Sequence, residues 1–141
     1  MRYFILVSHG EFAPGMKNAL GMLAGERDDL LATSLLDGMD VNTYRARFAD
    51  TVKDVTAEDE VILFGDLISG SPFTTALDVL AQKGIGEKLV AVGGMNIPMV
   101  MTALFSDEDT PLEEVAAEFL AEGVDQIKRF QPEAGDEDDD I

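Results

Sequence analysis

The sequence predicts an α/β fold, a three-layer sandwich in which helices cover both faces of a parallel β-sheet. Short apolar runs, the first of them at 4–7, are typical of strands buried on both faces. Segments with helical periodicity lie between these runs, so strands and helices alternate along the chain. The connections between parallel strands are right-handed crossovers, which gives a mostly parallel sheet.

Four parallel strands are expected, and glycine or polar residues end most of the apolar runs. With the first strand central, the common order of such a sheet is 2-1-3-4, in which strands 1 and 3 flank the point where the winding reverses. The short segment 126–130 is a candidate for a last strand. The predicted parallel strands are 3–8, 30–36, 61–64 and 89–92.

Five helices are expected between and after these strands. Ser71 and Pro72 predict an N-cap followed by a proline in the first helical position, and 110–113 reads as a capping box. Gly123 is placed to end the last helix. The predicted helices are 14–24, 42–52, 71–82, 98–105 and 111–122, and the expected inner face of the last one is Leu112, Val115, Ala116, Phe119 and Leu120.

The composition limits the possible classes of protein. A chain of 141 residues suits one domain, which we expect at 1–130, followed by an acidic tail or linker at 131–141. Cysteine is absent, which excludes disulfides and thiolate metal sites. No signal peptide and no apolar stretch of membrane-spanning length is apparent, so we expect a cytoplasmic protein.

The chain is strongly acidic, with 28 acidic and 10 basic residues and a formal net charge of −18. This charge repels nucleic acid and anionic lipid, so no nucleic-acid partner is expected. It would steer a basic protein toward the surface, although an acidic surface also serves solubility or a salty cytoplasm alone.

His9, the only histidine of the chain, follows the first predicted strand, and Asp66 follows the third. The carboxyl ends of neighbouring central strands meet at one crevice, where open α/β sheets bind ligands. A carboxylate on one ring nitrogen leaves the other nitrogen as a free lone pair, so the pair suits nucleophilic attack. The alternatives are a structural histidine and a loop-capping aspartate.

Gly70 and Ser71 start the helix after Asp66, and a helix N-terminus offers backbone N–H groups and a positive dipole end to phosphate. A metal site is not expected, because no second histidine or cysteine is present. The Gly-x-Ser-x-Gly, Walker and Rossmann motifs are also absent, so no nucleotide or other cofactor is expected.

Three segments carry a family resemblance: 7–15 (VSHGEFAPG), Asp66 with 70–73 (GSPF), and 94–99 (GMNIPM). Together they resemble the IIA domain of mannose-family sugar phosphotransferase systems, in the family's order and over about 2–130. The resemblance implies that His9 accepts a phosphoryl group from the carrier protein HPr and passes it to a IIB component during sugar uptake.

The resemblance also implies roles for the neighbouring residues. Asp66 would hold the inner ring nitrogen, and Ser71 and its helix N-terminus would bind the phosphoryl oxygens. Asn96, Pro98 and Met99 would line the rim of the crevice. A homodimer is implied, in which an antiparallel C-terminal edge strand at 126–130 is exchanged, with contact to the membrane only through the IIC and IID components.

Two other functions remain open on the residues alone. A regulatory module would change its docking to a partner with the phosphorylation state of His9, with no sugar involved. A phosphotransfer subunit of a dihydroxyacetone kinase is similar in fold, but its histidine loop usually lacks the continuation seen at 10–13. The sugar cannot be read from this chain.

Overall fold

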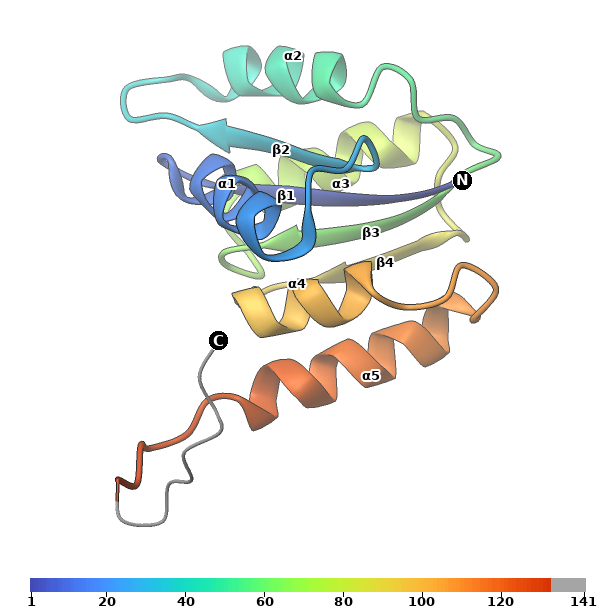
Figure 1. Cartoon of the computed structure of the whole chain (residues 1–141). Helices are drawn as coiled ribbons and strands as arrows, with labels where there is room; N and C mark the ends of the chain where they lie inside the picture. The colour runs from blue at the N-terminus through green and yellow to red at the C-terminus, as the bar shows by residue number, and fades with distance from the viewer. Residues whose placement is uncertain (133–141) are drawn as a thin grey trace.

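The computed structural model describes residues 1–132, which form four parallel strands and five helices in alternation (Figure 1). The sheet order is β2-β1-β3-β4, so the predicted class, order and parallel pairing are confirmed. The elements are β1 (Arg2–His9), α1 (Phe12–Ala24), β2 (Leu30–Leu35), α2 (Val41–Thr51), β3 (Glu60–Gly65), α3 (Ser71–Gln82), β4 (Leu89–Val92), α4 (Ile97–Leu104) and α5 (Leu112–Asp125).

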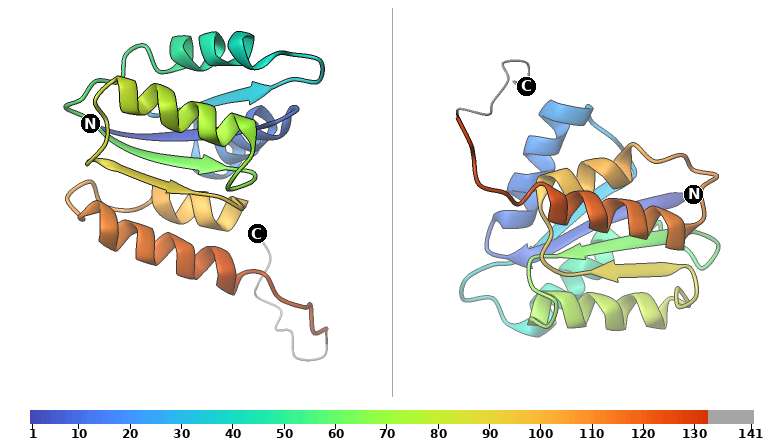
Figure 2. Two further views of the ribbon diagram at one scale, coloured as in Figure 1. Left: turned by 180° about the vertical axis from the view of Figure 1, so that it is seen from behind. Right: turned by 90° about the horizontal axis from the view of Figure 1, so that it is seen from below.

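Helices cover both faces of the sheet, with α2 and α3 on one face and α1, α4 and α5 on the other (Figure 2). Alternate residues of β1 explain the two layers. Phe4 and Leu6 pack under α1, α4 and α5, whereas Ile5 and Val7 pack under α2 and α3. All four side chains are buried, as a strand covered on both faces requires.

Four of the five helices begin one or two residues away from the predicted start, and α3 begins at the predicted residue but with a different N-cap. Gly70, not Ser71, is the N-cap of α3, so Pro72 occupies the second helical position. Asn96 caps α4 by accepting a 3.0 Å hydrogen bond from the Met99 N–H, and the helix therefore begins at Ile97.

The predictions for α5 were partly wrong. Pro111 is its N-cap, no side-chain capping bond forms, and the predicted capping box is absent at this helix. The helix continues through Gly123, whose missing side chain admits Met99; a Cβ there would lie 2.8 Å from the Met99 Cβ. Leu120 is 38% exposed and does not belong to the inner face, because α5 is the outermost helix of its layer (Figures 1 and 2).

The predicted last strand is not formed within this chain. Gln126 is the C-cap of α5, and residues 127–130 make no strand pairing in the part of the chain that the structure describes. Ile127 and Phe130 are exposed. Exchange of this segment between two copies stays a prediction, and the acidic tail lies outside the described residues except for 131–132.

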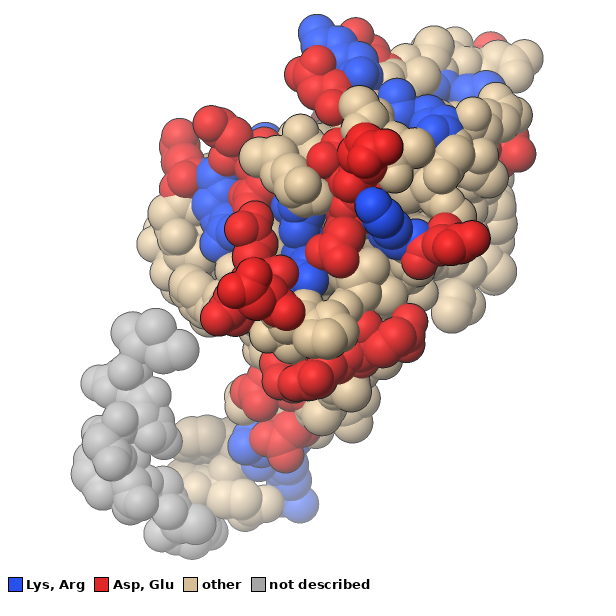
Figure 3. Space-filling view, turned by 90° about the vertical axis from the view of Figure 1, so that its right-hand side faces the viewer, with Lys and Arg blue, Asp and Glu red and all other residues tan. Residues whose placement is uncertain are grey.

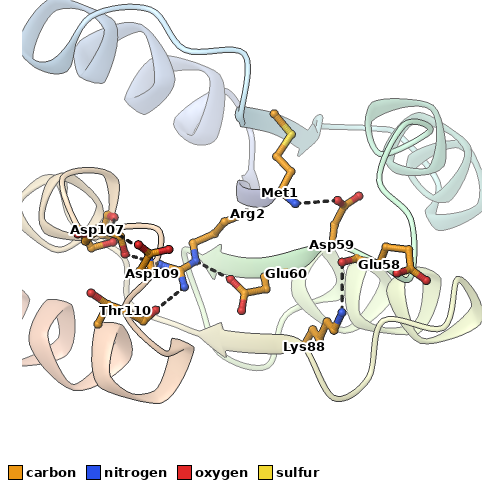
Figure 4. Close-up of polar contacts among 11 residues, drawn as sticks. Met1, Arg2, Glu58, Asp59, Glu60, Lys88, Asp107, Asp109 and Thr110 are labelled. Atoms are coloured by element: carbon orange, nitrogen blue, oxygen red, sulfur yellow. Dashed lines mark hydrogen bonds and ion pairs between the residues drawn. The ribbon is translucent and has the colours of Figure 1, made fainter.

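Acidic side chains gather at the edge of the sheet where the strands begin (Figure 3). Arg2 lies among them, only 3% exposed, with its Nε donating to Glu60 at 2.9 Å and its Nη atoms donating to the carbonyls of Asp107 and Thr110 (Figure 4). Each nitrogen of this guanidinium therefore donates a hydrogen bond, and these bonds join β1 to β3 and to the loop before α5.

Candidate functional site

His9 is the last residue of β1, at the opposite edge of the sheet, and its side chain is 46% exposed. The residues on either side hold it there. The buried Ser8 Oγ accepts a 2.7 Å hydrogen bond from the Ala13 N–H at the start of α1. Gly10 turns the chain with φ +58 and donates its N–H to the Leu35 carbonyl.

Asp66 follows β3 directly, and the structure brings it to His9 as the strand order requires. One carboxylate oxygen, Oδ2, lies 2.9 Å from the His9 Nδ1 and accepts the His9 backbone N–H at 3.0 Å. The other oxygen accepts the Leu67 N–H at 2.9 Å. The carboxylate is therefore fixed on both oxygens, and it fixes the ring together with its own backbone.

The charge state of Asp66 determines the tautomer of the histidine. Partial burial acts to raise the pKa of this carboxyl, but the hydrogen bonds from His9 and Leu67 outweigh it and lower the pKa below its ordinary value. Asp66 is thus a carboxylate and accepts at the His9 Nδ1, so Nδ1 carries a proton. The neutral ring then has its lone pair on Nε2.

Gly70 lies beside the ring, at the N-cap of α3. A Cβ at this position would be 2.7 Å from the His9 Cε1 and 3.3 Å from Nε2, so only a residue without a side chain leaves this side of the ring open. The backbone φ of −81° suits any residue, which makes space the reason for glycine. Ser71, the first residue of α3, is exposed next to it.

Tyr44 contacts the start of α3, and the sequence analysis assigned it no role at the site. It is fully buried on α2, and its hydroxyl donates a 2.9 Å hydrogen bond to the Pro72 carbonyl. Burial and the nearby charge of Asp66 raise the pKa of this phenol, so it stays protonated and remains a donor.

The third predicted segment lies beyond β4. Asn96 and Pro98 are half-buried, and the Asn96 Nδ2 donates to the Gly123 carbonyl at 3.3 Å. Met99 is 4% exposed and packs against Gly123. Asn96 and Met99 thus join α4 to α5, and Met99 presents no side chain to solvent at a rim.

Three exposed apolar side chains lie next to the site in sequence, and sequence reasoning missed them as a group. Phe12 is 50% exposed, Leu67 is 56% exposed and Ile68 is 68% exposed. Phe12 begins α1, three positions after His9, and Leu67 and Ile68 lie in the loop that immediately follows Asp66. Large apolar side chains in a polar loop were the available signal, because such exposure is typical of a contact surface for another protein.

Within residues 1–132, no three His, Cys, Asp or Glu side chains come together as a metal site would require. None of the helices in that part of the chain is both long and apolar enough to cross a bilayer.

Fold and site together define a class: an open parallel α/β domain that presents one carboxylate-held histidine beside a helix N-terminus, at the winding reversal of its sheet. A family model described as PTS system fructose IIA component, EIIA-man, matches residues 3–120. The chain belongs to this family, whose members are phosphotransferase components.

Known relatives agree with this membership. The fructose-specific EIIA component of Bacillus subtilis is 26% identical over 111 residues, 79% of this chain and 74% of that protein. The mannose-specific EIIAB component of Escherichia coli K12 is 26% identical over 128 residues, which are 88% of this chain but only 39% of the relative. This chain thus matches less than half of the EIIAB protein.

The fold has close counterparts among solved structures. The PTS IIA protein associated with the fucose utilization operon of Streptococcus pneumoniae superposes with a TM-score of 0.76 at 26% identity, covering 95% of this chain and 96% of that one.

Proposed function

We propose that this protein is a sugar phosphotransferase IIA component that accepts a phosphoryl group from phospho-HPr on His9 and passes it to a IIB component. The observation that supports this proposal most directly is the 2.9 Å contact between the His9 Nδ1 and Asp66, with Nε2 left open. The proposed partners and the proposed cytoplasmic location follow from the family.

The transfer is a displacement at phosphorus. The Nε2 lone pair of His9 forms the new N–P bond while the bond between phosphorus and the donor's histidine breaks, and its electron pair returns to that donor nitrogen. The ring of His9 gains positive character as it attacks, and the Asp66 carboxylate on Nδ1 stabilises it. The proton stays on Nδ1, so transfer to the IIB histidine follows the same path in reverse.

The start of α3 would hold the phosphoryl oxygens during both transfers. The helix dipole favours negative charge there, and the Ser71 hydroxyl and N–H are available at the first helical position. Gly70 leaves room for the group beside Nε2. In this proposal Asn96 and Pro98 stand at the rim, and Met99 supports them from below.

Phe12, Leu67 and Ile68 would form the protein-binding surface around His9. The exposed apolar side chains at the end of α5, Val124 and Ile127 among them, would be covered by a second copy of the chain in a homodimer. The sugar itself would be bound by the membrane components IIC and IID, to which this protein would be linked only through IIB.

The proposal is tested by incubating the protein with HPr, its kinase and radiolabelled phosphoenolpyruvate. We expect one acid-labile, base-stable phosphoryl group per chain, as a phosphohistidine gives. His9→Gln should take up no label, while Lys53→Gln, at an exposed position just after α2, serves as a control that labels normally. Label on the His9→Gln variant, or none on the natural chain, would overturn the proposal.

A further inference from the structure

The loop 66–70 packs against Gly93, the residue after β4. Asp66 is at one end of this loop and Gly70 is at the other. A Cβ at Gly93 would lie 2.5 Å from the Ile68 Cβ, 2.6 Å from its Cα and 2.7 Å from its N. The backbone of the loop therefore occupies the space where any other residue would place its side chain. The backbone φ of Gly93 lies outside the left-handed region, so space alone requires glycine here.

Hydrogen bonds join the same two segments on either side of this contact. The Gly94 N–H donates to the Asp66 carbonyl at 3.2 Å, and the Met95 N–H donates to the Gly65 carbonyl at 3.1 Å. From the other side, the Asp66 N–H donates to the Val7 carbonyl at 3.2 Å. These hydrogen bonds hold the loop between β1 and the segment 93–95. The close contact between the Ile68 backbone and Gly93 determines how near the loop lies to that segment.

Both ends of this loop touch the ring of His9. Asp66 holds Nδ1 at 2.9 Å, and the Gly70 backbone lies so close to Cε1 that a Cβ there would be 2.7 Å away. We infer that Gly93 is a positioning residue for phosphoryl transfer: by admitting the Ile68 backbone, it sets the loop that orients His9. This inference rests on the proposed function, in which the orientation of Nε2 determines the rate.

The test compares Gly93→Ala with Gly86→Ala, a matched control because a Cβ at Gly86 meets nothing within 4 Å. His9 is the only histidine, so its ¹⁵N ring signals report one tautomer without ambiguity. When the ring is neutral, we expect the natural chain and Gly86→Ala to hold the proton on Nδ1. Gly93→Ala should shift it toward Nε2 and slow transfer from phospho-HPr about 100-fold, as a misplacement near 1 Å does.

Kinetic constants separate positioning from docking. Ile68→Ala keeps the backbone that rests on Gly93 and removes only an exposed side chain, so it should raise the KM for phospho-HPr and leave the tautomer unchanged. Gly93→Ala should instead lower kcat. The double variant Gly93→Ala with Ile68→Gly removes the closest of the three contacts, so its tautomer shift should fall between those of the natural chain and Gly93→Ala.

The double variant replaces Gly93→Ala if the single variant does not fold. A folded variant with the natural tautomer and a transfer rate within about twofold of Gly86→Ala overturns the inference. Failure of both variants to fold also counts against it, because Gly93 would then serve the fold and not the site. If the natural chain accepts no phosphoryl group, the proposed function fails, while the tautomer still reports whether Gly93 orients the ring.

Discussion

Arg2 and His9 stand at the two ends of the same strand, and each pairs with a carboxylate from β3 or the residue after it. Arg2 is 3% exposed and finds an acceptor for each arm of its guanidinium (Figure 4). His9 is 46% exposed, with Nδ1 held by Asp66 and the Nε2 side kept clear by Gly70. Removing a buried cation whose donors are all paired leaves its acceptors without partners, whereas the open nitrogen of a ring paired on one side only is what the proposed transfer requires.

The largest expected effect is that of Arg2→Met on stability, which tests the structural role of the Arg2 end of the strand. Arg2→Met leaves the Glu60 carboxylate and two carbonyls without their donor, which should lower the free energy of unfolding by about 3 kcal/mol. Denaturant unfolding measures it. Lys88→Met, at the same edge, removes a more exposed donor to the Glu58 carbonyl and should cost less than about 0.5 kcal/mol.

The rate of phosphoryl transfer should not change in this variant. The folded Arg2→Met protein should transfer phosphoryl groups at the natural rate, because Arg2 lies at the far edge of the sheet from His9. A loss of transfer in a folded Arg2→Met protein would break the comparison, since the two ends of β1 would then not be independent.

Asp66→Asn should have the next largest effect. An amide in place of the carboxylate removes the negative charge that stabilises the attacking ring and no longer fixes the proton on the His9 Nδ1, so transfer should slow about 100-fold. Rapid-quench measurement of phospho-HPr turnover gives the rate. Asp59 pairs with the Met1 amine at the edge of the sheet where the strands begin, far from His9. Asp59→Asn should therefore leave the transfer rate unchanged.

The stability of the same variant should depend on pH. Because folding lowers the pKa of Asp66, its stabilising contribution is present above the unfolded carboxyl pKa of about 3.9 and is lost as the pH falls through the lower folded value. The difference in unfolding free energy between the natural chain and Asp66→Asn should therefore shrink on acidification. A constant difference would contradict a carboxylate held by His9 and Leu67.

Gly70→Ala should have a smaller effect on transfer. The added Cβ meets the His9 ring at 2.7 Å, and turning the ring away from its rotamer costs of the order of 1 kcal/mol, or about fivefold in rate. Gly15→Ala is the matched control, because a Cβ there meets nothing within 4 Å. Equal rates for the two variants would show that the open side of the ring has no role.

Tyr44→Phe should have the smallest effect, a loss of about 1 kcal/mol in unfolding free energy, measured by thermal denaturation. The substitution removes only the hydroxyl that donates to the Pro72 carbonyl. Transfer should fall by less than it does in Gly70→Ala, because Tyr44 supports α3 and does not touch the ring. Tyr3→Phe, on β1, controls for the loss of a phenol elsewhere.

The sheet could be predicted from the sequence because its strands are buried on both faces. Each strand then appears as an apolar run, and the four predicted strands match the observed ones within one residue at each end. The neighbourhood of His9 and Asp66 followed from the strand order. Helix ends were less predictable, since both Gly70 and Ser71 suit an N-cap and only the path of the loop selects between them.

Contacts between distant segments could not be predicted. The bond from Tyr44 to Pro72 spans 28 positions and depends on how α2 packs over α3. Leu120 follows the helical period of α5 but faces outward, because the width of the buried stripe depends on what covers the helix. The close approach of Ile68 to Gly93 is likewise visible only in three dimensions, since glycine in a turn has many possible reasons.

Because only one side of the His9 ring is exposed, the phosphoryl donor and the phosphoryl acceptor must bind one after the other. Under the proposed function, donor and acceptor must each bring a histidine to the same nitrogen, Nε2, past the same apolar side chains of Phe12 and Ile68. Two proteins cannot occupy that surface together. The relay is therefore a succession of two binary complexes, and an excess of either unphosphorylated partner should inhibit the other's reaction competitively.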